Sequence, residues 1–164
     1  MWGQVLGLTP HEKEVDIMSV SADLETRVRI LGDIEAIKKL KARYWRCIDK
    51  KLWDELEGVY ATDAVQEYGE DRVQGGGKAV VPWIRKGIED VATAHGGHSP
   101  EIEITSDATA RGIWALQDYL VWKSGMKLMG FGHYEDEYVK EGEEWKIKST
   151  KVVRTLEEWT AAKQ

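Results

Sequence analysis

Hydrophobic residues recur every three to four positions in the first part of the chain, which is the spacing of helices with one buried face. A weak helical pattern over residues 22–31 is interrupted at Gly32, and Asp33 is read as the cap of a new helix. Two further helices are predicted over roughly 50–60 and 78–93, with a short strand at 63–68 and a glycine-rich turn at 69–77 between them. The clearest stripe belongs to the helix that starts at Asp33, and its members are Ile34, Ile37, Leu40, Tyr44, Cys47 and Ile48.

From residue 99 the hydrophobic positions alternate instead, as in half-buried strands. Ile102 and Ile104 alternate with glutamates, and a turn follows at Ser106-Asp107. Long strands are predicted at 110–123, 126–140 and 144–155, joined by hairpin turns. Helices followed by consecutive antiparallel strands indicate an α+β fold. We assign one domain to residues 22–159, an N-terminal extension to 1–21 and a tail to 160–164.

Composition narrows the class of protein. The chain has 164 residues, of which 42% are hydrophobic and 32% charged, with a net charge of −6. This size suits one domain with its own core, and the acidic balance argues against nucleic acid or a membrane as partner. Since no stretch has the pattern of a signal peptide or a membrane span, a cytoplasmic location is expected. Eight tryptophans and six tyrosines suit either a large apolar pocket or a tryptophan-rich core.

Candidate chemistry starts from a phenol and a carboxylate, Tyr44 and Asp49, five residues apart. A helix turns about 100° per residue, so the two would share a pocket only if the helix ends at Asp49. The helix dipole disfavours a carboxylate there, so a partner is expected, and the candidate is a histidine from 95-HGGH-98, which is predicted to be a loop. Asp118 is the only charge on a strand face shared with Trp114, Leu116, Leu120 and Trp122. It is therefore either a pocket carboxylate or an expensive core residue.

The chain resembles SnoaL-like members of the nuclear-transport-factor-2-like (NTF2-like) superfamily. The segments that carry the resemblance are 33-DIEAIKKLKARYWRCIDKKLWDEL-56, 95-HGGHSPEIEI-104, Thr109–Asp118, 132-GHYEDEY-138, 145-WKI-147 and 152-VVRTLEEW-159. Within the superfamily the chain is most similar to bile-acid 7α-dehydratases, which eliminate water from a steroid nucleus. It departs from them in a shorter hairpin around Lys123–Gly130, a longer N-terminus and a shorter tail. The resemblance implies a cone-shaped fold, with three N-terminal helices packed on a strongly curved antiparallel sheet around one deep pocket.

The resemblance also implies roles for single residues. His95 matches the catalytic histidine and Asp49 the carboxylate that orients it, while Arg154 matches a family arginine that would neutralise Asp118 or contact the substrate. Tyr44 would donate a proton to the leaving oxygen. In an apolar wall, Asp118 would have a raised pKa and would act as an acid, or hold Tyr44 or the substrate hydroxyl. The expected substrate-binding residues are Tyr68, Trp83, Leu116 and Leu120.

The expected activity is that of a cofactor-independent lyase that removes water from a hydroxylated, ketone-activated steroid or similar polycycle, with or without a coenzyme A thioester. The alternatives are an isomerase, a dehydrochlorinase or an epoxide hydrolase with the same dyad, or a non-catalytic ligand-binding domain. A homotrimer or homodimer is expected by analogy. His98 completes a His-x-x-His pair, but two histidines without a third ligand do not indicate a metal site. Gly75, Gly76 and Gly77 lack the flanking residues of a phosphate loop.

Overall fold

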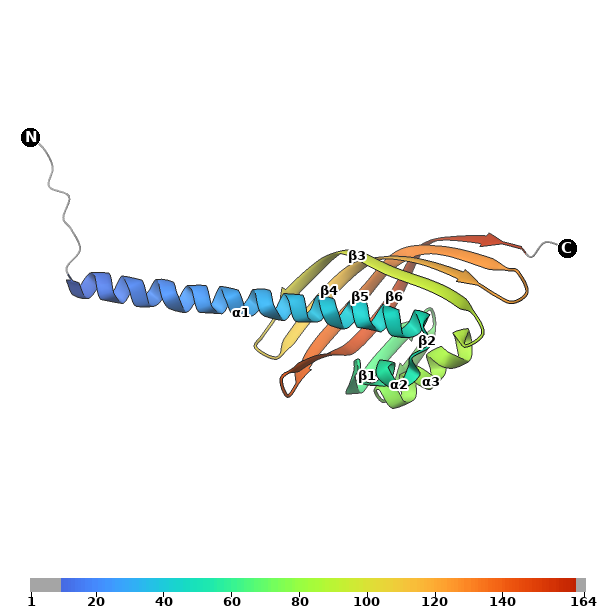
Figure 1. Cartoon of the computed structure of the whole chain (residues 1–164), viewed down its shortest axis with the longest axis horizontal. Coiled ribbons are helices and arrows are strands. Elements are labelled where there is room, and N and C mark those ends of the chain that lie inside the picture. Colours follow the sequence, from blue (N-terminus) through green and yellow to red (C-terminus); the bar gives the residue numbers. More distant parts are fainter. Residues whose placement is uncertain (1–9, 162–164) are drawn as a thin grey trace, which may run out of the picture. The chain divides into compact units, whose positions relative to one another are not determined.

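The computed structural model describes residues 10–161, with side chains from residue 21 onward. The chain divides into two compact units, Met1–Asp33 and Ile34–Gln164. The elements in chain order are α1 (Pro10–Asp49), α2 (Trp53–Glu57), β1 (Tyr60–Tyr68), β2 (Asp71–Gln74), α3 (Gly77–Ile88), β3 (Ala92–Ile104), β4 (Thr109–Val121), β5 (Lys127–Glu141) and β6 (Glu144–Thr160). The α+β class is confirmed, and the strands form a curved, open sheet (Figure 1).

Helix α1 continues through Gly32, so the predicted break at Gly32–Asp33 is wrong. An exposed glycine costs a helix only about 1 kcal/mol relative to alanine, which the hydrogen bonds of a long helix tolerate. Oppositely charged residues four apart support the helix on this stretch, with 3.8 Å between Arg27 Nη1 and Asp23 Oδ2 and 4.0 Å between Arg29 Nη1 and Asp33 Oδ2. No helix among the described residues is long and apolar enough to span a membrane.

The sheet has six strands in the order β2-β1-β6-β5-β4-β3. Every neighbouring pair is antiparallel except β1 and β6, which are parallel, so the expectation of a fully antiparallel sheet is wrong at this pair. No tight turn joins these two strands; most of the domain lies between them in sequence, so the chain can return in either direction. The strand predicted at 63–68 is longer in the structure, because it already begins at Tyr60, which pairs with Ile147 of β6. The helix predicted at roughly 50–60 is correspondingly shorter, and α2 spans only Trp53–Glu57.

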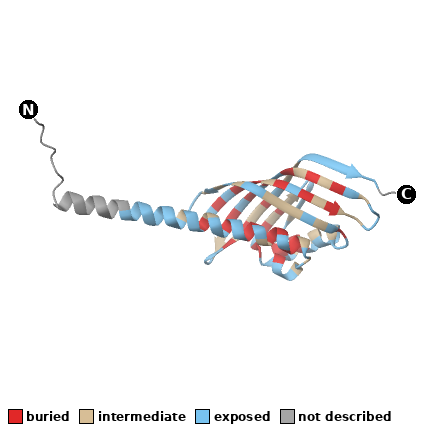
Figure 2. Ribbon diagram, turned by 45° about the horizontal axis from the view of Figure 1, so that its top comes forward, coloured by how far each residue is buried: buried red, intermediate tan, exposed pale blue. Residues whose placement is uncertain are grey.

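The core lies between the sheet and the C-terminal part of α1, residues 34–49. Ile37, Tyr44 and Ile48 of this helix are buried in one cluster with Trp114 and Tyr134 of the sheet. Buried and exposed positions alternate along the strands, as the bands of Figure 2 show, and the predicted phase of β4 is confirmed by its buried residues. They include Trp114, Leu116, Asp118 and Leu120. The inward face of the sheet therefore carries both the core and Asp118.

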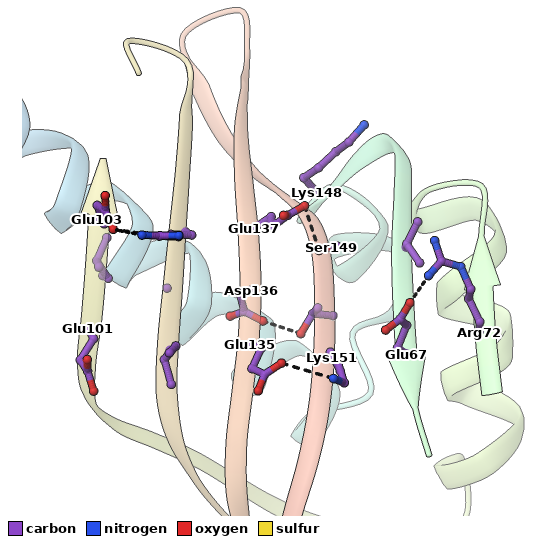
Figure 3. Close-up of a pocket in the computed structure, with 16 residues that line it drawn as sticks. Glu67, Arg72, Glu101, Glu103, Glu135, Asp136, Glu137, Lys148, Ser149 and Lys151 are labelled. Atoms are coloured by element: carbon purple, nitrogen blue, oxygen red, sulfur yellow. Dashed lines mark hydrogen bonds and ion pairs between the residues drawn. The ribbon is translucent and has the colours of Figure 1, made fainter. Parts of the chain in front are cut away.

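The outward face of the sheet is hollowed and charged (Figure 3). A groove of about 870 Å³ runs over β1, β2 and β3 to β6. Its charges pair with one another across strands: Glu103 Oε2 lies 2.6 Å from Arg111 Nη2, and Glu135 Oε2 lies 3.4 Å from Lys151 Nζ. Such pairs on a solvated face contribute little to stability. This groove shares no residue with the pocket that contains His95.

Candidate active site

The segment 95–98, expected as a loop, lies inside strand β3. Residues three apart on a strand point to opposite faces, so His95 lies inward and His98 is exposed. The pair cannot share a metal ion, and the described residues contain no group of three metal-ligating side chains. Gly97 faces α1, where an added Cβ would lie 2.1 Å from Trp45 Cζ2. The glycine thus lets Trp45 pack directly against the strand.

Helix α1 ends at Asp49, as the chemistry required. The Leu52 N–H donates to the Cys47 carbonyl at 2.8 Å and the Lys51 N–H to the Ile48 carbonyl at 3.2 Å. This is the Schellman pattern that closes helix C-termini, and it puts Lys51 in the left-handed region at φ 57°. The sequence signal for such an end is normally glycine, so at this position the end was predicted from the chemistry of Asp49 and not from a glycine.

Three donors from β3 hold the Asp49 carboxylate. The His95 ring lies with Nδ1 2.7 Å from Oδ1, its backbone N–H donates to Oδ2 at 2.9 Å, and the Thr93 hydroxyl donates to Oδ1 at 2.9 Å. Burial raises the pKa of Asp49, but these hydrogen bonds and the charge of His95 outweigh it and hold the pKa below its usual range. The predicted contact between Asp49 and His95 is present. Thr93 was missed, because it shares a face with His95 only once both lie in a strand.

The His95 ring lies between two carboxylates and is mostly buried. A carboxylate oxygen can only accept, so Nδ1 carries a proton toward Asp49, and in the neutral ring the lone pair is then on Nε2. Nε2 lies 4.0 Å from Oδ2 of Asp118, which pairs with His95 across β3 and β4. The side chain is therefore oriented as a base whose accepting nitrogen faces the second carboxylate.

Asp118 is bound at two points by Arg154 of β6. Nη1 donates to Oδ1 at 2.7 Å and Nη2 to Oδ2 at 2.5 Å, and Asp118 is only 2% exposed. Burial lowers the pKa of Arg154, but the paired carboxylate outweighs it and raises the pKa. This two-point contact fits one of the two roles predicted for Arg154, neutralising Asp118, while the role of Asp118 as an acid stays a prediction. Gly130 leaves the space that the Arg154 guanidinium occupies, since a Cβ added at this glycine would lie 1.8 Å from Nη1.

Tyr44 lies among other tyrosines beneath the pocket. Its ring meets those of Tyr60 and Tyr134 edge-on, each at 6.1 Å between centroids, and its hydroxyl shares a hydrogen bond with that of Tyr60. Burial, helped by the charge of Asp136, raises the pKa of Tyr44. The phenol is therefore neutral at physiological pH and available as a hydrogen-bond or proton donor.

The inward pocket has a volume of about 520 Å³, within the range of about 300–1,000 Å³ typical of small-molecule sites. Tyr68, Trp83, Leu116 and Leu120, predicted to bind substrate, all line it together with Tyr44, His95, Asp118 and Arg154. Trp122 and Trp159 also line the pocket, with 5.5 Å between their ring centroids. The sequence did not predict either of them as a substrate-binding residue. Trp159 had no predicted role because β6 was expected to end at residue 155.

Comparison with known proteins adds a family and a set of similar folds. The sequence model of the family described as SnoaL-like domain matches residues 29–151. A hexachlorocyclohexane dehydrochlorinase (LinA) type 2 superposes with a TM-score of 0.76 at 17% identity, over 82% of this chain and 93% of that one.

Two other solved structures show the same fold. A protein of Novosphingobium aromaticivorans, provisionally assigned as a scytalone dehydratase, superposes with a TM-score of 0.74 at 20% identity, over 80% of this chain and 90% of that one. The type 3 dehydrochlorinase of Novosphingobium barchaimii LL02 superposes with a TM-score of 0.74 at 18% identity, over 82% of this chain and 94% of that one.

Proposed function

The chain belongs to the SnoaL-like domain family, and we propose that within it this protein is a cofactor-independent lyase that eliminates water from a hydroxylated, ketone-activated polycycle such as a steroid. The observation that carries the proposal is the 2.7 Å contact between Asp49 and His95 at the wall of an apolar and aromatic pocket. An oriented imidazole beside a site for an apolar ligand suits removal of a carbon-bound proton.

In the proposed reaction, His95 Nε2 removes a proton from the carbon next to the one that bears the hydroxyl group. That proton is acidic because the resulting carbanion is conjugated with the ketone as an enolate. The electron pair then forms the new double bond while the C–O bond breaks. Asp49 holds the ring and stabilises the imidazolium, and steps of this kind contribute about 10²–10⁴-fold to rate.

Tyr44 is the proposed acid for the leaving group. Its neutral phenol gives a proton to the departing hydroxyl, which leaves as water, and the imidazolium proton returns to the phenolate through pocket water. Tyr68, whose ring centroid lies 5.7 Å from Arg154 Cζ, is the second phenol within the pocket. The paired Asp118 and Arg154 supply a fixed dipole beside Nε2 rather than a proton, and Asp118 stabilises the charge that develops on the ring.

A direct test is incubation of the protein with a 7α-hydroxy-3-oxo-4-ene steroid, as the free acid and as the coenzyme A thioester. Dehydration extends the conjugation to a 4,6-dien-3-one, so absorption moves to longer wavelength and the mass falls by one water. We expect this product with the parent protein and not with His95→Ala. Failure to dehydrate this steroid and other hydroxyketones would overturn the lyase proposal.

The same assay set separates the alternatives. A shifted double bond without loss of mass would indicate an isomerase, chloride release from a chlorinated cyclohexane a dehydrochlorinase, and diol formation an epoxide hydrolase. Saturable binding of a steroid, measured by tryptophan fluorescence, without any turnover would indicate a ligand-binding domain. Assembly as a homotrimer or homodimer stays a prediction, which light scattering would test.

A further inference from the structure

Lys51 has a backbone conformation that its residue type disfavours. It follows the end of α1 at the position where glycine is common, and its φ of 57° is left-handed. Side chains with a Cβ are strained there, and strained residues persist where the surrounding structure holds them. Glycine would close the helix equally well, so the helix end by itself gives no reason for a lysine.

The side chain of Lys51 reaches back toward the candidate dyad. Its Nζ donates to Thr93 Oγ1 at 3.2 Å, and Thr93 Oγ1 donates to Asp49 Oδ1 at 2.9 Å. Burial lowers the pKa of Lys51, while the charge of Asp49 opposes the decrease. The chain thus brings an ammonium group into a partly buried place beside the carboxylate that holds His95.

The direction of these hydrogen bonds is determined by the donors. An ammonium group can only donate, so the Thr93 oxygen accepts from Lys51 and turns its own proton toward Asp49. Asp49 Oδ1 then receives Thr93 and the His95 ring, and Oδ2 receives the His95 N–H. Three donors in fixed positions define the plane of the carboxylate.

We propose that Lys51 and Thr93 are positioning residues: they fix the Asp49 carboxylate and so hold the His95 ring in the tautomer with the proton on Nδ1. The expected effect on turnover rests on the proposed lyase function, but the expected effect on the tautomer of the His95 ring does not. Lys51 also offsets the negative charge of Asp49 at the helix C-terminus, where a cation is favourable.

The sharpest variant is Lys51→Gly, because glycine suits the left-handed backbone while the ammonium group is lost. We expect a melting midpoint equal to or above that of the parent. Thr93→Val removes the relaying hydroxyl with little change in volume. Lys51→Arg and Thr93→Ser are the conservative variants that should retain the parent behaviour, and Lys50→Ala, at an exposed neighbour, controls for net charge.

The readout that needs no substrate is the protonation of each His95 ring nitrogen, from long-range ¹H–¹⁵N correlation spectra at neutral pH, with His95→Ala used for assignment. We expect the parent and the three control variants to show one tautomer, protonated on Nδ1. Lys51→Gly and Thr93→Val should show a mixture. Where the parent turns over a substrate, kcat should fall about tenfold in these two, equivalent to about 1.4 kcal/mol in the barrier, with little change in KM.

The outcomes distinguish this inference from the proposed function. If Lys51→Gly and Thr93→Val keep the parent tautomer, or the parent itself lacks a proton on Nδ1, the positioning role is overturned. A lower melting midpoint in Lys51→Gly with an unchanged ring also overturns it, since the role would then be structural. A mixed tautomer in both variants, with no turnover by the parent, supports the positioning role and counts against the lyase instead.

Discussion

Asp49 carries its charge at a place where a helix disfavours one, the last turn of α1. Hydrogen bonds from Thr93 and His95 lower its pKa in the folded state, so folding stabilises the ionised form. This stabilisation is complete above the ordinary value of 3.8 and is lost as the pH falls from there through the lower folded value. The residue therefore links the geometry of the site to stability in acid.

We expect this link to appear in the acid unfolding of Asp49→Asn. The difference in free energy of unfolding between the parent and the variant should shrink as the pH falls below about 4, because the parent alone must protonate Asp49. Urea unfolding at a series of pH values measures it. A difference that stays constant, or grows, in acid would show that the folded pKa of Asp49 is not lowered.

At the same scale, His95→Ala and Asp49→Asn should lower turnover by about 10²–10⁴-fold with a small change in melting midpoint. Asp49 keeps the Thr93 hydroxyl and the residue-95 N–H when the imidazole is removed, and its side chain is 25% exposed to water. His98→Ala, on the opposite face of the same strand, is the matched control. A large thermal loss in either dyad variant would indicate a structural pair instead.

At the scale of elements, a buried ion pair joins α1 to the sheet. Lys41 Nζ lies 2.7 Å from Asp136 Oδ2 of β5, and both side chains are fully buried. The hydroxyls of Tyr138 and Thr150 also donate to Asp136, at 2.6 and 2.5 Å. The ammonium lies 4.5 Å from the ring centroid of Tyr44. The pair thus sits directly beneath one wall of the pocket.

Lys41→Met should reduce the free energy of unfolding by about 3–5 kcal/mol, since it leaves a buried carboxylate without its counter-ion. Urea unfolding measures the change. Lys151→Met is the control: its ion pair with Glu135, at 3.4 Å, lies on the outward face, and the expected loss is about 0–1 kcal/mol. A loss below about 1 kcal/mol for Lys41→Met would show that the hydroxyl donors alone satisfy Asp136.

At the scale of the whole molecule, most of the first unit, Met1–Asp33, precedes the family domain in sequence. The family match begins at residue 29, and residues 21–29 are all exposed. We expect a chain that starts at residue 29 to keep its melting midpoint within about 2 °C of the full chain, because the described side chains that it loses, those of residues 21–28, are all exposed. Calorimetry at several protein concentrations checks this.

Leu24, Val28 and Leu31 make the result informative in either direction, since these large apolar residues are 59%, 59% and 65% exposed. A midpoint that falls on truncation, and that depends on concentration only in the full chain, would contradict the prediction. It would show that the removed segment contributes to an assembly of copies.

The sequence by itself determined the features that depend on neighbours along the chain. The apolar stripe of residues 34–48, the alternation around Asp118 and the turns between the last strands follow from side-chain periods of 3.6 and 2. These predictions are confirmed, because a buried face imposes its period wherever it packs. The contact of Asp49 with His95 was anticipated from a family resemblance and a helix that had to end there, while the roles of both residues stay predictions.

Only the tertiary structure decided the rest. Gly32 could end a helix or lie within one, and its neighbours did not distinguish the two. The segment 95–98 became a strand because β4 lies beside it, and that pairing brought Thr93 and His95 to one face. The contacts of Lys51 and Trp159 are with residues distant in sequence, Thr93 and Trp122. Neither contact could be predicted from the residues nearby along the chain. Hydrogen bonds and packing between distant segments are set by the whole fold, which local patterns do not encode.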